Sequence, residues 1–154
     1  MEHLNCYYAS AVLLKISRAL KLVSVFILTT PNVVSLYKRL RLLLGKQPVH
    51  RYHVREYTIR EAISIVKRAG FEVVKAYYSI INDLTLIDAD LEEHLDISSF
   101  KSMAKVILKK PTKQNISRLL AYPIVKLRPS LRQLIVVVAV KAREPIVREQ
   151  EIWG

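Results

Sequence analysis

One short segment of this 154-residue chain gathers side chains suited to proton transfer and anion binding. The segment runs His53-Val-Arg55-Glu56-Tyr57. Histidine can act as a general base near neutral pH, and arginine holds anions through its planar set of donors. We therefore predict His53 and Tyr57 as candidate catalytic residues, and His53, Arg55 and Tyr57 as substrate-binding residues. The alternative is a loop anchored by Arg–Glu pairing and a packed tyrosine, and the two readings remain open.

A second candidate lies where an apolar segment ends. Asn32 follows Thr30-Pro31, at the carboxyl end of a predicted strand. Ligand sites of α/β proteins form at such strand ends. The same asparagine also suits the N-cap of a following helix. Because the two roles are compatible, Asn32 joins the candidate substrate-binding residues.

Several other chemistries find no support. The three glycines cannot form either of the usual glycine-rich phosphate loops, and the single cysteine excludes an internal disulfide. His50 with His53, and Asp88 with Asp90, lack the ligand number and spacing of a metal site. No nucleophile-elbow or zinc-protease motif occurs. We therefore expect no metal and no hydrolase activity.

Hydrophobic periodicity and helix-breaking residues predict an alternation of helices and strands. The expected helices are 7–21, 33–44, 58–69 and 98–110, and the expected strands are 23–29, 71–78 and 133–141. Thr58 and Glu61 form a capping box, and Gly70 suits the left-handed residue that ends the helix. This order predicts an α/β fold.

Three finer expectations follow from the same pattern. The helix after Asn32 should bury a stripe of apolar residues, namely Val33, Leu36, Leu40, Leu43 and Leu44. The prolines at 111, 123 and 129 should break the chain into short pieces. The strand 134–140 lacks polar alternation, so it should be central in the sheet and buried on both faces.

Charge is distributed unevenly along the chain. The net charge is +12, yet residues 83–96 hold six acids and no Lys or Arg, whereas residues 97–143 hold eleven basic residues and no acid. This balance favours an anionic partner, such as a nucleic acid, a membrane surface or an acidic substrate. No apolar run approaches the about 20 residues of a membrane span, and no basic segment opens the chain. We therefore expect a cytoplasmic protein.

Taken in order, these segments resemble class I S-adenosylmethionine-dependent methyltransferases, from the end of the fourth strand of that fold onward. The matching stretches are Glu2-His3-Leu4, Ser17-Arg-Ala-Leu-Lys21, Val25-Phe-Ile-Leu-Thr-Thr-Pro-Asn32, His53-Val-Arg-Glu-Tyr-Thr58 and Gly70-Phe-Glu-Val-Val74. The resemblance covers residues 1–143, with 144–154 as a tail. It implies a partial Rossmann-like fold of about three strands, the last one central and antiparallel, with a helical insertion at 83–132 before it.

The resemblance also implies what such a segment would contribute. Glu2 and His3 match a pair near the cofactor, so they are candidate cofactor-binding residues, although a frayed terminus is the alternative. The glycine-rich loop that holds S-adenosylmethionine in the family has no counterpart here. We therefore expect the acceptor-side, C-terminal half of a methyltransferase that is inactive alone and does not bind its cofactor alone.

Two consequences concern the sheet. The family usually has Lys-Pro-Gly-Gly before this fold's fifth strand, whereas this chain has Lys21-Leu-Val-Ser24, so the turn should be strained or rebuilt. Residues 25–29 should form an apolar edge, which favours association with the missing N-terminal half or with a second copy.

A different class of function stays open beside this one. The basic region 97–143 mixes cations with Leu, Ile, Phe100 and Met103. Such a surface suits a non-catalytic module that binds an anionic membrane, a lipid-linked acceptor or a nucleic acid. The chain has no recognisable nucleic-acid module, so we expect membrane or lipid before nucleic acid. A solvated basic face is the alternative.

Overall fold

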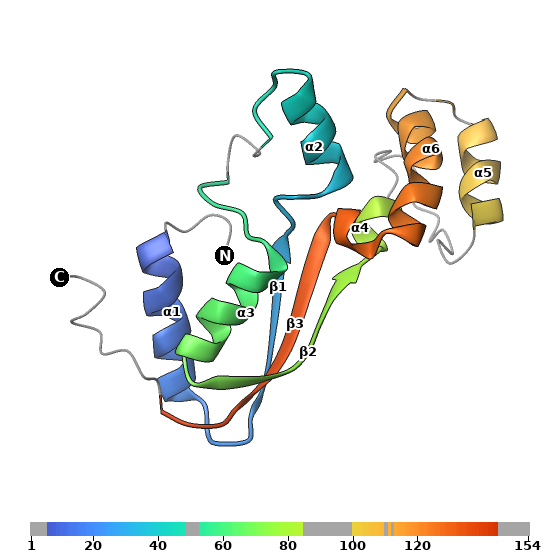
Figure 1. Cartoon of the computed structure of the whole chain (residues 1–154). Helices are drawn as coiled ribbons and strands as arrows, with labels where there is room; N and C mark the ends of the chain where they lie inside the picture. The colour runs from blue at the N-terminus through green and yellow to red at the C-terminus, as the bar shows by residue number, and fades with distance from the viewer. Residues whose placement is uncertain (1–5, 49–52, 85–99, 110, 112, 145–154) are drawn as a thin grey trace.

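The computed structural model describes residues 6–48, 53–84, 100–109, 111 and 113–144 (Figure 1). The helices are α1 (Cys6–Ala19), α2 (Leu36–Leu43), α3 (Ile59–Arg68), α4 (Ile81–Leu84), α5 (Phe100–Lys109) and α6 (Lys113–Leu127), with a 3₁₀ turn, η1 (Pro129–Leu131). The strands are β1 (Val25–Pro31), β2 (Phe71–Ser79) and β3 (Leu134–Lys141). The chain is thus mixed α/β, as the order of elements predicts.

The strands of the described residues form one open antiparallel sheet in the order β1-β3-β2. Val25 pairs with Val140 and Pro31 with Leu134, while Phe71 pairs with Lys141 on the other side of β3. The prediction that the last strand is central is therefore confirmed. A register shift between Val73 and Lys75 marks a bulge in β2.

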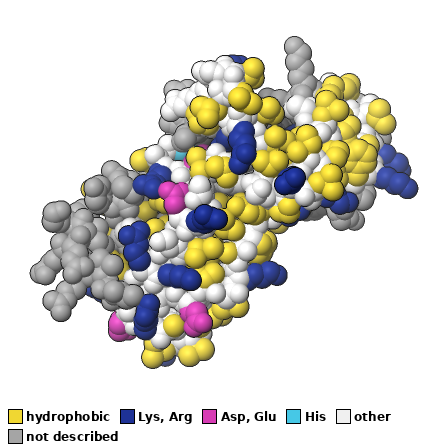
Figure 2. Space-filling view, in the orientation of Figure 1, with side chains coloured by type: hydrophobic (Ala, Val, Ile, Leu, Met, Phe, Trp, Pro, Cys, Tyr) yellow, Lys and Arg dark blue, Asp and Glu magenta, His cyan; other side chains and the backbone are white. Residues whose placement is uncertain are grey.

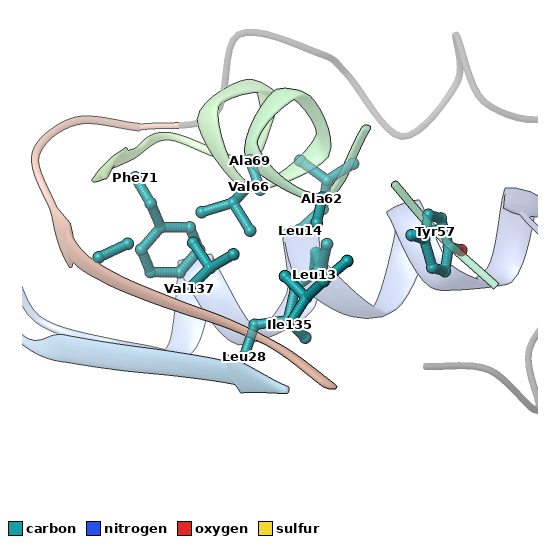
Figure 3. Packing of buried hydrophobic residues seen from close by; sticks show 11 residues of the cluster. Leu13, Leu14, Leu28, Tyr57, Ala62, Val66, Ala69, Phe71, Ile135 and Val137 are labelled. Carbon is teal, nitrogen blue, oxygen red and sulfur yellow. The ribbon is translucent and has the colours of Figure 1, made fainter. Parts of the chain in front are cut away.

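Helices α1 and α3 cover one face of this sheet and complete the core (Figure 1). Figure 3 shows Leu13 of α1 and Val66 of α3 packed toward Leu28, Ile135 and Val137 of the strands. At one end of this core the rings of Phe26 and Phe71 stack, with centroids 4.7 Å apart. The core therefore joins elements from both ends of the sequence.

The opposite sheet face is more open than the sequence predicts. Val25 and Ile27 of β1 point to this face and are 63% and 61% exposed. Val138 and Val140 of β3 are only partly buried there. The expectation that β3 is buried on both faces thus holds only in part: Val136 is buried on this face, but Val138 and Val140 are not, because α1 and α3 pack on the other side.

The capping signals predict the boundaries of α3 correctly. Thr58 accepts a hydrogen bond from the Glu61 backbone N–H, and the Glu61 carboxylate accepts one from the Thr58 N–H. Gly70 follows the helix with φ of 89°, a conformation that costs glycine little. This reciprocal cap fixes where the polar loop before α3 ends and the helix begins.

The turn before β1 is strained, as its sequence predicts. Val23 has φ of 68°, the one positive φ outside glycine in the described residues. Ser24 N–H donates to Lys21 O (3.2 Å), and Val23 N–H donates to Lys141 O (2.9 Å). Val23 thus occupies a turn position that favours glycine, at a cost of about 1–2 kcal/mol for an L-residue.

The expectation for the helix after Asn32 is wrong in its start and in its buried stripe. Helix α2 begins at Leu36 with Ser35 as N-cap, because the side chain of Asn32 is used in the preceding turn. No residue of α2 is buried, and Leu43 is 83% exposed. The helix projects beyond the carboxyl end of β1 (Figure 1), so its leucines have no sheet beneath them.

The expectation that proline breaks the chain at position 123 is also wrong. Pro123 lies inside the continuous helix α6. A proline within a helix costs about 3 kcal/mol. Tyr122 and Val125 on either side of it are buried, so packing of their side chains offsets that cost. The acidic residues of 83–96, apart from Asp83, and the tail from 145 onward lie outside the described residues.

Candidate functional site

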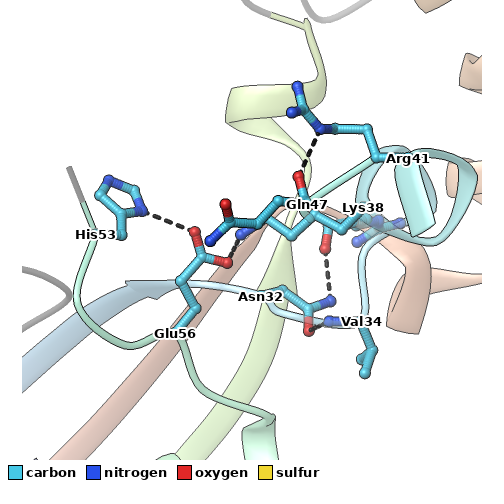
Figure 4. Close-up of polar contacts among 8 residues, drawn as sticks. Asn32, Val34, Lys38, Arg41, Gln47, His53 and Glu56 are labelled. Carbon is cyan, nitrogen blue, oxygen red and sulfur yellow. Dashed lines mark hydrogen bonds and ion pairs between the residues drawn. The ribbon is translucent and has the colours of Figure 1, made fainter. Parts of the chain in front are cut away.

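A buried carboxylate is the centre of the polar cluster at the carboxyl end of β1. The Glu56 side chain is 0% exposed. Its Oε1 lies 2.7 Å from Nδ1 of His53, and its Oε2 is ion-paired with the ammonium of Lys38 (Figure 4). Lys38 comes from α2 and His53 from the loop before α3. The cluster therefore joins α2 to a loop that follows it in sequence.

Backbone pairing positions this loop against the end of β1. Asn32 and Tyr57 form an isolated parallel bridge, in which Val33 N–H donates to Tyr57 O (3.2 Å). Tyr57 itself is buried in the core. Because Glu56 precedes this anchored residue, its side chain is directed to the opposite side, toward α2.

Asn32 makes hydrogen bonds within the chain through its side chain. Its Nδ2 donates to Ser130 O (2.9 Å) and Arg132 O (2.7 Å), and its Oδ1 accepts from Val34 N–H (3.2 Å). The residue is completely buried. Asn32 thus fastens the end of β1 to the segment before β3, and its predicted substrate contact stays a prediction.

Arg55 and Tyr57 lie on the other side of the loop from Glu56. Arg55 donates to Glu61 Oε1 (3.0 Å). The Cζ atom of its guanidinium lies over the Tyr57 ring, 5.4 Å from the ring centroid. Both residues line a small hollow of about 130 Å³ between the loop and α3, together with Arg68. The Arg–Glu anchoring expected as the alternative is therefore present, with Glu61 as the acid.

The predicted site residues are thus divided into two groups. His53 lies with Glu56 and Lys38, which were not predicted as site residues, whereas Arg55 and Tyr57 lie with Glu61. The pKa of Glu61 is lowered, chiefly by the hydrogen bond from the Thr58 backbone N–H. The Thr58 hydroxyl and Arg55 lower it further, and together these effects outweigh the partial burial of the carboxylate, which raises the pKa. Glu61 is therefore a charged capping residue, whereas the His53 group is the candidate for proton transfer.

The arrangement of His53 suits a general base. When Nδ1 donates to the buried carboxylate of Glu56, the imidazole is held in one orientation and its lone pair lies on Nε2. Lys38 supplies a compensating positive charge to the same carboxylate, so Glu56 can stay ionised in a buried position. Such a histidine can accept a proton from a hydroxyl or amine acceptor.

Lys38 was not among the predicted site residues. Position 38 falls on the side of its helix opposite the apolar stripe, which is typical of a solvated residue. Its side chain is instead 11% exposed, because α2 turns this side toward the loop before α3. The available signal was its place in the first turn of α2, together with a later loop, 46–57, that carries a single carboxylate, Glu56.

A second buried carboxyl group, Asp83, lies at the same end of the sheet, beside the residues that precede β3. Asp83 Oδ2 accepts from Gln133 N–H (3.1 Å), and Arg132 donates to Tyr78 O (2.8 Å) beside it. Burial raises the pKa of Asp83, although the hydrogen bonds from Gln133 and the charges of Arg132 and Arg118 oppose that effect. Asp83 thus links α4 to the start of β3, which is a structural role.

Glu2 and His3 lie outside the described residues. Within the described ranges, no group of three or more His, Cys, Asp and Glu side chains could hold a metal ion. None of the described helices combines the length and apolarity needed to cross a membrane.

No protein-family model and no curated protein matches this chain.

Proposed function

We propose that this chain forms the acceptor-side half of an S-adenosylmethionine-dependent methyltransferase domain. The observation that carries the proposal is the strand order β1-β3-β2, with the last strand between the other two and antiparallel to both. The sequence resemblance implies this arrangement for the final three strands of that fold. An order in which the last strand lay at an edge would have spoken against it.

The position of the polar cluster supports the same proposal. Glu56, His53 and Lys38 lie at the carboxyl end of β1, where α/β folds bind ligands. In this proposal His53 is the general base that accepts the proton of the methyl acceptor, and Glu56 is its positioning residue. S-adenosylmethionine would supply the methyl group, held by the half of the domain that carries a glycine-rich loop.

The edge strand indicates where that other half would pair. The strand β1 is bonded to β3 on one side, and no described strand pairs with its other side. Its residues Val25 and Ile27 also present an apolar surface. Unpaired, apolar strand edges associate with other chains. The partner would therefore add a strand along β1, either from a polypeptide with the glycine-rich half or from a second copy.

Calorimetric titration of the purified chain with S-adenosylmethionine and S-adenosylhomocysteine tests the first part. We expect no binding by the folded chain alone, since its three glycines cannot form the family's cofactor loop. Micromolar binding by the chain alone would contradict the proposal that a second half is required.

A second experiment tests the pairing. The chain is co-expressed with the coding sequence immediately upstream of its own, and any co-purified complex is titrated with S-adenosylmethionine. We expect binding in the complex, and we expect Ile27→Glu to prevent co-purification while Leu22→Glu, at a similarly exposed position, does not. Failure of every complex to bind the cofactor would overturn the methyltransferase assignment.

A further inference from the structure

The outer side of α6 carries a continuous exposed apolar stripe. It consists of Ile116, Leu120, Pro123, Ile124 and Leu127. At 3.6 residues per turn these positions fall within an arc of about 100°. Leu120 is 70% exposed and Leu127 is 80% exposed. We call this stripe the α6 face.

The opposite side of α6 accounts for its packing. Tyr122 and Val125 are buried, and Tyr122 contacts Phe100 of α5 with ring centroids 5.5 Å apart. The α6 face is therefore not required for the fold among the described elements. A soluble helix of this kind would be expected to carry polar residues on the side away from its packing partners.

Among the described residues, the exposed charges next to the α6 face are positive. Lys126 and Arg128 are exposed at the end of α6, and Lys101, Lys105 and the largely exposed Leu108 are on α5, which packs against α6. The sequence from 97 to 143 contains no acid. Figure 2 shows hydrophobic side chains gathered over α5 and α6 at the upper right, with Lys and Arg beside them.

We propose that the α6 face binds the surface of a bilayer that contains anionic phospholipids. An apolar stripe bordered by cations enters the boundary between headgroups and acyl chains, while the cations meet lipid phosphates. The absence of acidic residues from this part of the sequence makes the charge complementary to such a surface. Helix α2, with exposed Leu43 and Arg39 at the same end of the molecule, would approach it as well (Figure 1).

Other occupants fit the α6 face less well. A second copy would bring the same cations against these cations. A nucleic acid would match the charge but would leave the leucines facing a polar groove. The other half of the proposed methyltransferase would pair along β1, whereas α6 packs on α4, which follows β2 at the opposite edge of the sheet. The membrane inference is thus independent of the proposed enzymatic function.

Vesicle flotation tests the proposal with the full chain. We expect binding to vesicles of phosphatidylcholine mixed with phosphatidylglycerol, little binding to phosphatidylcholine alone, and weakening as salt is raised. Leu120→Glu combined with Leu127→Glu should lower the partition coefficient at least about 100-fold. Both positions are exposed, so the double variant should retain the circular dichroism spectrum of the parent.

Leu22→Glu is the matched control, since Leu22 is 60% exposed in the turn before β1, away from α6. It should bind anionic vesicles as the parent does. Equal binding of the parent to neutral and anionic vesicles, or unchanged binding by the double variant, would overturn the proposal. Binding to a DNA or RNA oligonucleotide without binding to anionic vesicles would also overturn it and would identify nucleic acid as the partner.

Discussion

The ammonium of Lys38 is paired with the carboxylate of Glu56, and this carboxylate has no exposed surface. The pair connects α2, which buries none of its residues, to the loop that precedes α3. Apolar packing therefore contributes little to the position of α2. The ion pair, with the turn around Asn32, is what holds α2 over the end of β1.

Replacing Lys38 with Met tests the strength of this connection. Loss of one partner of a buried pair leaves the other charge uncompensated, which costs about 3–5 kcal/mol. Urea denaturation should therefore show a large decrease in the free energy of unfolding. Lys15→Met, at an exposed position of α1, should change it by less than about 0.5 kcal/mol. Adding Glu56→Gln to Lys38→Met should recover part of the loss, and additive effects of the two substitutions would contradict a direct pair.

The strained turn before β1 offers a stabilising substitution. Val23 has a positive φ and is 78% exposed, so Val23→Gly removes strain and loses little packing. After the greater backbone freedom of glycine in the unfolded chain is subtracted, we expect a gain of up to about 1 kcal/mol. Thermal unfolding measures it. Val54→Gly, at an exposed position without positive φ, should destabilise, and a similar loss at Val23 would show that the turn is not strained.

The capping box of α3 predicts a pH dependence. The pKa of Glu61 is lowered below its ordinary value of 4.5, chiefly by the Thr58 backbone N–H. Its contribution to stability is therefore complete above pH 4.5 and is lost as the pH falls through the lower, folded-state pKa. The parent should lose more stability than Glu61→Gln in this acidic range. Thr58→Ala, which removes the hydroxyl of the cap, should cost about 1 kcal/mol at neutral pH.

Asp83 should show the opposite pH dependence. Burial raises its pKa above 3.8, so the folded state holds the proton more tightly than the unfolded state. Its contribution favours folding at low pH and is lost as the pH rises from 3.8 through the folded-state pKa. Asp83→Asn can still accept from Gln133 N–H, and its stability relative to the parent should increase over this rise. Denaturation at several pH values measures the difference, and a constant difference would contradict a raised pKa.

The strands could be predicted from the sequence because short apolar runs mark them. The central position of β3 was predicted from the unbroken apolar run 134–140 and from the resemblance of the sequence to the methyltransferase fold. The cap of α3 was equally predictable, since Thr58, Glu61 and Gly70 act through local geometry. The strain at Val23 was predicted from the resemblance alone, because the family that the sequence resembles has glycines in that turn.

The leucines of α2 show what periodicity does not supply. Leu40, Leu43 and Leu44 form an apolar side, but a pattern does not tell whether any other element covers that side. These leucines are exposed because α2 begins only after the turn held by Asn32. The helix therefore projects beyond the ends of the strands. Lys38 was missed for the same reason, since its burial depends on a loop that comes later in the chain.

The central position of β3 has a consequence for how the chain folds during synthesis. Both β1 and β2 pair only with β3 among the described strands, and β3 is the last of them to be made. The α3–β2 unit is local and can begin to form early, but β1 must wait for a partner separated from it by most of the chain. Such long-range pairing is slow and leaves apolar strands exposed meanwhile. Until residues 134–141 have left the ribosome, β1 therefore lacks the strand with which it pairs in the folded chain.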